Sequence, residues 1–143
     1  MITNISLTSV FVKDIDESKA FYVDKLGFQE RADIALGDYR WVTVGHPDQP
    51  ELELHLTTPS PPFTEDMIAA LYRALDAGGM NGPGLHVDDC RATAADLKAK
   101  GVDFLQEPTE RPYGVEALIR DNSGNWLVLV EPRPFDPSIP FGE

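Results

Sequence analysis

The sequence predicts an α+β protein built from two similar βαβββ modules in tandem. Two segments support this, VKDIDESKAFYVDKLGF from Val12 and VDDCRATAADLKAKGVDF from Val87, which start 75 positions apart. Both read as a strand end, an acidic residue, a helix and a glycine. Each helix is preceded by one strand-like run and followed by three, judged from β-branched and aromatic residues and the turn residues between them. This repeat indicates duplicated modules.

The first helix is expected to begin after Asp14 and to end at Gly27. Asp14 and Glu17 have the spacing of a capping box, in which side chains satisfy free backbone N–H groups of the first turn. The second copy has Asp89 as its cap and Gly101 as its stop, which predicts an amphipathic helix of similar length.

The remaining elements follow from strand-like runs, turn residues and prolines. Strands are expected at residues 5–12, 28–35, 40–45 and 51–57, and again near 84–87, 104–109, 115–120 and 125–131. A third helix is expected over residues 64–77, where Met67, Leu71 and Leu75 recur at helical spacing. The predicted organisation is a first module (1–60), a linker with a helix (61–81), a second module (82–132) and a proline-rich tail (133–143) that runs extended over a surface, a partner subunit being one candidate.

Composition narrows the class of protein. The chain has 143 residues, 42% of them hydrophobic, which suffices for a packed core, and its net charge of −12 argues against nucleic acid and anionic lipid as partners. No apolar stretch approaches the ~18 residues of a membrane span, and the N-terminus does not read as a signal peptide. We therefore expect a cytoplasmic protein with no membrane partner. The single cysteine, Cys90, reads as a small buried hydrophobe rather than a nucleophile.

Four segments of the chain resemble the vicinal oxygen chelate superfamily of glyoxalase I, extradiol dioxygenases and bleomycin resistance proteins. They are VKDIDESKAFYVDKLGF, VDDCRATAADLKAKGVDF, EPTERPYGVEALIRD and NSGNWLVLVEP. The resemblance covers about residues 5–132. It implies that the two modules curl their sheets into an open barrel around a cavity, often with the help of a second subunit. It also implies a homodimer, which agrees with the exposed sheet edges expected of two small modules.

Metal-dependent members of this family place His and Glu ligands at four positions, on the first and last strands of each module. Carried over by motif, these positions are Leu7, Glu53, Gly82 and Val128. Positions 7 and 82, like positions 53 and 128, are 75 apart, which supports this register. One carboxylate among these four side chains is too few donors for a divalent cation, so we expect no metal and no cofactor.

A shift of register does not restore a metal triad, but one displaced site stays open. Glu53 and His55 share a face of their strand, as do Gly82 and His86, so Glu53, His55 and His86 are an alternative ligand set. Glu53 is also the candidate acid–base residue, because an apolar interior would favour proton transfer there. Alternatively, a hydrogen bond to Arg40, Arg120 or a Tyr would leave Glu53 only to orient a ligand.

The function predicted from these observations is metal-free binding, with sequestration of a small aromatic or cationic molecule as in the bleomycin-resistance branch. The alternative is a lyase, isomerase or dioxygenase of the same superfamily that uses Glu53 or a rearranged metal site. A ligand cavity would be largely apolar with a few polar groups. Strand alternation and the turn that carries Tyr113 give its expected lining: Leu7, Ser9, Phe11, Trp41, Glu53, His55, His86, Tyr113, Trp126 and Val128.

Overall fold

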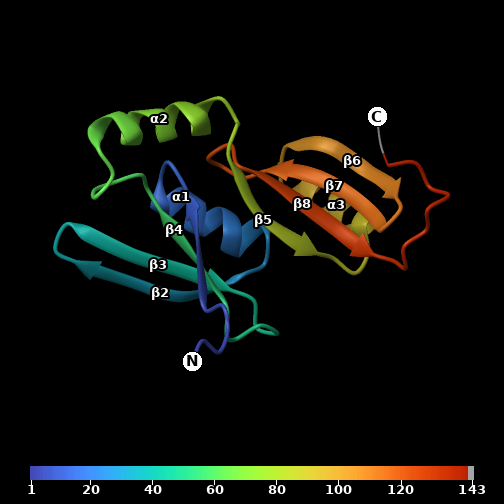
Figure 1. Cartoon of the computed structure of the whole chain (residues 1–143), viewed down its shortest axis with the longest axis horizontal. Coiled ribbons are helices and arrows are strands. Elements are labelled where there is room, and N and C mark those ends of the chain that lie inside the picture. Colours follow the sequence, from blue (N-terminus) through green and yellow to red (C-terminus); the bar gives the residue numbers. More distant parts are fainter. Residues whose placement is uncertain (142–143) are drawn as a thin grey trace. The chain divides into compact units, whose positions relative to one another are not determined.

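The computed structural model describes residues 1–141 and divides into two compact units, Met1–Ala77 and the part from Gly78 onward. Each unit contains one four-stranded sheet with helices, and neither sheet closes into a barrel (Figure 1). The predicted α+β fold of two βαβββ modules is confirmed. The helix predicted over residues 64–77 belongs to the first unit, which ends at Ala77.

The first unit has strand order β1-β4-β3-β2, with β1 parallel to β4 and the other neighbours antiparallel. Its elements are β1 (Leu7–Phe11), α1 (Ile15–Ala20), the π-helical turn η1 (Phe21–Lys25), β2 (Gln29–Leu36), β3 (Tyr39–Gly45), β4 (Glu53–Thr57) and α2 (Glu65–Asp76).

The second unit repeats this topology, with strand order β5-β8-β7-β6 and β5 parallel to β8. Its elements are β5 (Asn81–His86), α3 (Cys90–Ala99), β6 (Phe104–Arg111), β7 (Gly114–Arg120) and β8 (Trp126–Pro132). Every predicted strand and helix is present, and no strand end differs from its predicted position by more than three residues. No helix within residues 1–141 is both long and apolar enough to cross a membrane.

Side-chain caps begin the helices where the sequence predicts them. The Asp14 carboxylate accepts a hydrogen bond from the Glu17 backbone N–H at 2.9 Å, and Asp89 accepts from Ala92 at 3.0 Å. Thr64 caps α2 in the same way. Such caps satisfy backbone donors that have no partner within the helix.

The π-helical turn is the one element of the first module that the sequence did not predict. Thirteen positions separate the cap Asp14 from the stop Gly27, whereas twelve separate Asp89 from Gly101, and both glycines have positive φ, 83° and 82°. A π turn accommodates one more residue than an α turn, so η1 takes up the extra residue. Cap and stop signals mark the ends of a helix but carry no information on its winding.

Each sheet packs one face against a helix. In the first unit this face carries Val42, Val44, Leu54 and Leu56, and in the second it carries Ala117, Ile119, Leu127 and Leu129; all are almost completely buried. Because side chains alternate across a strand, residues at the intervening positions lie on the opposite face.

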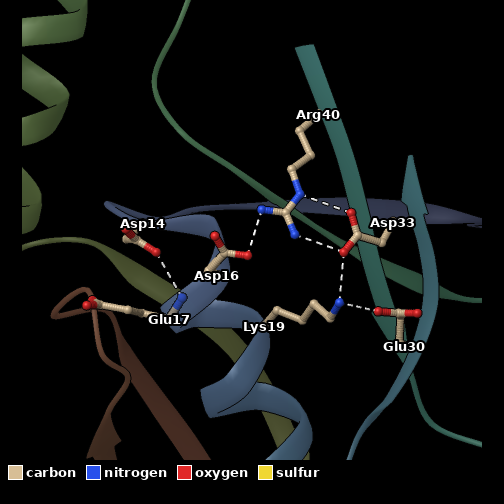
Figure 2. Close-up of polar contacts among 7 residues, drawn as sticks. All are labelled: Asp14, Asp16, Glu17, Lys19, Glu30, Asp33 and Arg40. Atoms are coloured by element: carbon tan, nitrogen blue, oxygen red, sulfur yellow. Dashed lines mark hydrogen bonds and ion pairs between the residues drawn. The ribbon is translucent and has the colours of Figure 1, made fainter. Parts of the chain in front are cut away.

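Charged side chains tie α1 to β2 and β3 (Figure 2). The Arg40 guanidinium donates to both carboxylate oxygens of Asp33, at 3.0 and 2.8 Å, and to Asp16 of α1 at 2.7 Å. Lys19 of α1 donates to Asp33 at 2.7 Å and pairs with Glu30. The hydrogen bonds from Arg40, and then from Lys19, hold the pKa of Asp33 well below its usual range.

The single carboxylate of β8, Glu131, lies near the end of the strand. Glu131 accepts a hydrogen bond from the backbone N–H of Cys90 at 3.0 Å, at the first residue of α3, and pairs with Arg133. The Cys90 N–H, followed by Arg133, lowers the pKa of Glu131. The first charge after the apolar run of β8 therefore serves helix capping. Burial raises the pKa of the Cys90 thiol, as expected for a structural cysteine.

The proline-rich tail contacts its own unit. The backbone N–H of Arg133 donates to the Tyr113 carbonyl at 2.9 Å, and that of Asp136 donates to the Pro112 carbonyl at 2.8 Å. The Phe141 ring lies 5.8 Å from the Tyr113 ring, centroid to centroid. The tail thus follows the β6–β7 turn; the last two residues of the predicted tail segment lie outside the described residues.

Replacing Asp33 by Asn is expected to lower the melting temperature at neutral pH. Because the pKa of Asp33 is lower in the folded than in the unfolded state, its contribution is present above the ordinary value of 3.8 and is lost as pH falls below it. The difference from wild type should therefore shrink at about pH 2 and in about 1 M salt. Thermal melts should show this, with Asp38→Asn, in the exposed β2–β3 turn, as the charge-matched control. Equal effects of the two substitutions would contradict the prediction.

Candidate functional site

The first sheet presents an aromatic and polar face on the side opposite α1. Strand pairing aligns Ser9 of β1, His55 of β4 and Thr43 of β3 in one row across this face. Alternation along the strands adds the remaining members. The predicted residues Leu7, Ser9, Phe11, Trp41, Glu53 and His55 all belong to it. We call this set, with Tyr39 and Thr43, the aromatic face.

His55 is the centre of the aromatic face. Its ring stacks on Trp41, with centroids 4.1 Å apart and an interplanar angle of 24°. Nδ1 lies 3.4 Å from the Ser9 hydroxyl, and Nε2 lies 3.3 Å from the Tyr39 hydroxyl. The residue is only 7% exposed, whereas Ser9 and Tyr39 are both exposed. Burial lowers the pKa of His55, so the neutral imidazole is favoured at neutral pH.

Glu53 lies two positions before His55 on the same face. Its carboxylate accepts a hydrogen bond from the buried Thr43 hydroxyl at 2.5 Å. The two arginines that the sequence offered as alternative partners are engaged elsewhere: Arg40 binds Asp33 and Asp16, and Arg120 donates to the backbone carbonyls of Gly78 and Gly124. Thr43 therefore orients the carboxylate.

Two apolar side chains of β1 extend the aromatic face. Phe11 makes an edge-to-face contact with Phe63, with centroids 5.8 Å apart. Leu7 is 37% exposed, at the other end of the strand. The β1 edge of the face is thus apolar at both ends, with Ser9 between them.

The second sheet presents a more apolar face on the side opposite α3. Pairing aligns Val128 with Leu118 of β7 and Gly84 of β5, and aligns Val130 with Glu116 and His86. Trp126 lies on the same face. Its Trp, Val and Leu side chains are half-buried, whereas Leu127 and Leu129 on the α3 side are almost completely buried. We call this set the apolar face.

A hydrogen-bonded cluster borders the apolar face. Glu116 accepts from the Tyr113 hydroxyl, from Arg111 Nε at 3.3 Å and from Gln106 Nε2 at 3.3 Å. Burial, and then the bond to Glu116, raises the pKa of Tyr113 to about 12. Gly114, next to Tyr113, has φ 146°, and a Cβ there would lie 2.0 Å from the Glu131 carbonyl oxygen, so the turn itself requires glycine.

The structure corrects the register inferred from the 75-residue repeat. Thr43 and Leu118, at positions 75 apart, pair with His55 and Val128, which are only 73 apart. His55 rather than Glu53 therefore corresponds to Val128, and Val128 pairs with Gly84 rather than Gly82. The cause is turn length, because residues 46–52 join β3 to β4 whereas only 121–125 join β7 to β8. A slip of two residues keeps every side chain on its face.

The donor set does not fit a bound metal ion. Leu7, Gly82 and Val128 have no side-chain atom that can ligate a metal ion. In the corrected register the fourth position carries the His55 imidazole in place of the Glu53 carboxylate. Within residues 1–141 no three His, Cys, Asp or Glu side chains gather into a possible metal site. Zn²⁺ needs at least three protein ligands even in an open site. The side chains at the four family positions therefore supply too few ligands to hold such an ion.

Several residues of these two faces were missing from the set predicted from the sequence. Tyr39, two positions before Trp41, could have been found by strand alternation, but the predicted strand began one residue later. Glu116 and Leu118 were also missing, although they share a face of β7 by the same alternation. Arg111 and Gln106 of β6 gave no such signal, because irregular pairing between β6 and β7 breaks the alternation there.

Comparison with known proteins shows the class to which this fold belongs. Residues 4–129 match the model of the Glyoxalase/Bleomycin resistance protein/Dioxygenase superfamily, and the chain belongs to this superfamily. The crystal structure of UcmS2 is 42% identical, with a TM-score of 0.85, and the match covers 92% of this chain and 99% of that chain. TnmS3, an antibiotic binding protein from Streptomyces sp. CB03234, is 30% identical, with a TM-score of 0.74 and coverage of 92% and 98%. YurT of Bacillus subtilis (strain 168) is 33% identical, with coverage of 89% and 98%.

Replacing His55 by Gln is expected to flatten the pH dependence of stability. Because burial lowers the pKa of His55 from 6.5, the unfolded state takes up the proton first, and wild type loses stability as pH falls through that value. Gln does not titrate. Urea unfolding at about pH 7.5 and about pH 5 should therefore show a smaller loss for the variant. His86→Gln, at an exposed position, is the control and should behave as wild type; equal losses in all three proteins would contradict this.

Proposed function

We propose that this chain is a metal-free small-molecule-binding protein of the superfamily, and that it sequesters an aromatic compound. The observation that carries the proposal is the stack of Trp41 on His55, with hydroxyl groups at both ring nitrogens. Aromatic rings bind other rings by stacking and bury large apolar areas. Small-molecule sites are commonly lined by apolar and aromatic side chains with a few oriented polar groups.

Two further observations support a ligand of this kind. TnmS3, described as an antibiotic binding protein, is similar over nearly the whole chain, which makes an antibiotic a reasonable ligand class here. The net charge of −12 and the Glu53 carboxylate on the aromatic face favour a neutral or cationic molecule over an anion. In the second unit, the apolar face, with Trp126, Val128 and Leu118 half-buried, is a second surface on which an aromatic molecule could bind.

An enzyme is the second candidate. Glu53 and His55 lie two positions apart on one face, so the Glu53 carboxylate is available there for proton transfer, and the His55 imidazole could take part only through the Ser9 or Tyr39 hydroxyl. A lyase or isomerase of this superfamily would use Glu53 as the acid–base residue. The two candidates differ in whether the bound molecule is chemically changed.

The test pairs Trp126→Ala with Leu127→Ala. Leu127 is completely buried on the α3 side, so its loss should cost about 2–5 kcal/mol of stability. Trp126 is half-buried, and its loss should cost distinctly less than the ~3–5 kcal/mol of a core Trp, while weakening ligand binding. Thermal melts and fluorescence titrations with aromatic, cationic and thioether ligands measure both quantities.

Binding should survive prior dialysis against EDTA, and mass spectrometry should recover the ligand unchanged. A converted ligand would favour the enzyme instead. Severe destabilisation by Trp126→Ala, together with no wild-type response to any ligand, would overturn the proposed function.

A homodimer is the assembly that we propose. Two exposed apolar side chains on the β2–β3 hairpin, Ile34 and Leu36, leave an uncovered surface of the kind that a partner subunit buries. Light scattering at micromolar concentration is expected to give roughly twice the 15.8 kDa chain mass. A measured mass equal to that of one chain would contradict this.

A further inference from the structure

The Ser9–His55–Tyr39 chain is a hydrogen-bonded unit in which one imidazole links two hydroxyl groups. His55 is buried, so it addresses a ligand only through its two exposed hydroxyl partners, Ser9 at Nδ1 and Tyr39 at Nε2. The three residues come from β1, β4 and β3, three adjacent strands of one sheet. Trp41 stacks on the imidazole between them. A planar ligand on this face would therefore meet an aromatic surface with a hydroxyl at each end.

A neutral imidazole has one N–H and one nitrogen lone pair. The hydroxyl that accepts a hydrogen bond from the imidazole N–H can still donate its own O–H to a ligand. The other hydroxyl must donate to the lone pair, so towards a ligand it can only accept. The chain therefore offers one donor and one acceptor at any time. A change of tautomer exchanges the two ends, so Ser9 and Tyr39 can each take either role.

From this geometry we infer that the aromatic face selects uncharged planar aromatic molecules with a hydrogen-bond donor at one end and an acceptor at the other. The inference rests on the proposed function and names the ligand class for that site. A hydroxyaryl ketone has this pattern. An aryl ether of the same shape lacks the donor, so one end of the chain would lose its partner.

An aromatic carboxylate fits less well. Its charged end can only accept, and the acidic group that faces the chain from β4 is Glu53, two positions from His55. The other titratable group around the imidazole is Tyr39 of β3, which belongs to the chain itself, and β1 contributes only Leu7, Ser9 and Phe11 on this face. A carboxylate would therefore be repelled by Glu53 at neutral pH.

The experiment compares three naphthalene probes by equilibrium dialysis at about pH 6.5: 6-acetyl-2-naphthol, its methyl ether, and 6-hydroxy-2-naphthoate. The naphthol should bind wild type about five- to tenfold more tightly than the ether, since the difference is one hydrogen bond. The carboxylate should bind most weakly. Ser9→Ala and Tyr39→Phe should each bring the naphthol-to-ether ratio towards one.

Thr8→Ala is the matched control, because Thr8 neighbours Ser9 on β1 but lies on the other face of the strand. It should keep the wild-type ratio. Melting temperatures close to wild type would show that Ser9→Ala and Tyr39→Phe are folded. Equal binding of naphthol and ether by wild type, or an unchanged ratio in both chain variants, would overturn the inference and leave the proposed function standing. No saturable binding of any probe would also overturn it, and the proposed function would then stand or fall on its own ligand panel.

Discussion

The packing of one helix against one face of each sheet is the constraint on which the rest of the structure depends. In a four-stranded sheet, alternation then divides every strand into side chains that meet the helix and side chains that do not. At the centre of each sheet the first set is aliphatic and almost fully buried, as Leu54 and Leu127 show. The second set is free to vary in chemistry, and the aromatic stack and the polar clusters are found in this second set.

Much of this was predictable from the sequence because it follows from local rules. Caps such as Asp14 and Asp89, glycine stops and strand alternation act over a few residues, so elements and faces were predicted correctly. The face shared by Ser9, Trp41 and His55 also follows from alternation. The correspondence of Glu53 with Val128 was wrong, because a repeat offset is not constant across turns of different length.

The partners of the polar groups could not be predicted, since they depend on the registers between strands. An arginine or a tyrosine was one alternative partner for Glu53, but the register of β3 against β4 places Thr43 near it instead. Arg40 projects from the other face, where Asp33 and α1 hold it. Strand parity determines which face a residue occupies, but the neighbour within hydrogen-bonding distance depends on turn lengths and bulges.

The polar groups of the two faces differ in how many of their hydrogen-bonding sites are used within the protein. This difference determines on which face a ligand can be recognised. On the second sheet, the Glu116 carboxylate receives hydrogen bonds from Arg111, Gln106 and Tyr113, so its acceptor sites are largely used within the protein. On the first sheet, the hydroxyls of Ser9 and Tyr39 each use one hydrogen-bonding site on His55, which leaves further sites for a ligand. A carboxylate with three donors stabilises its own sheet, whereas a neutral imidazole between two hydroxyls can still distinguish one ligand from another. For the ligand that we propose, specificity should therefore lie on the aromatic face of the first unit.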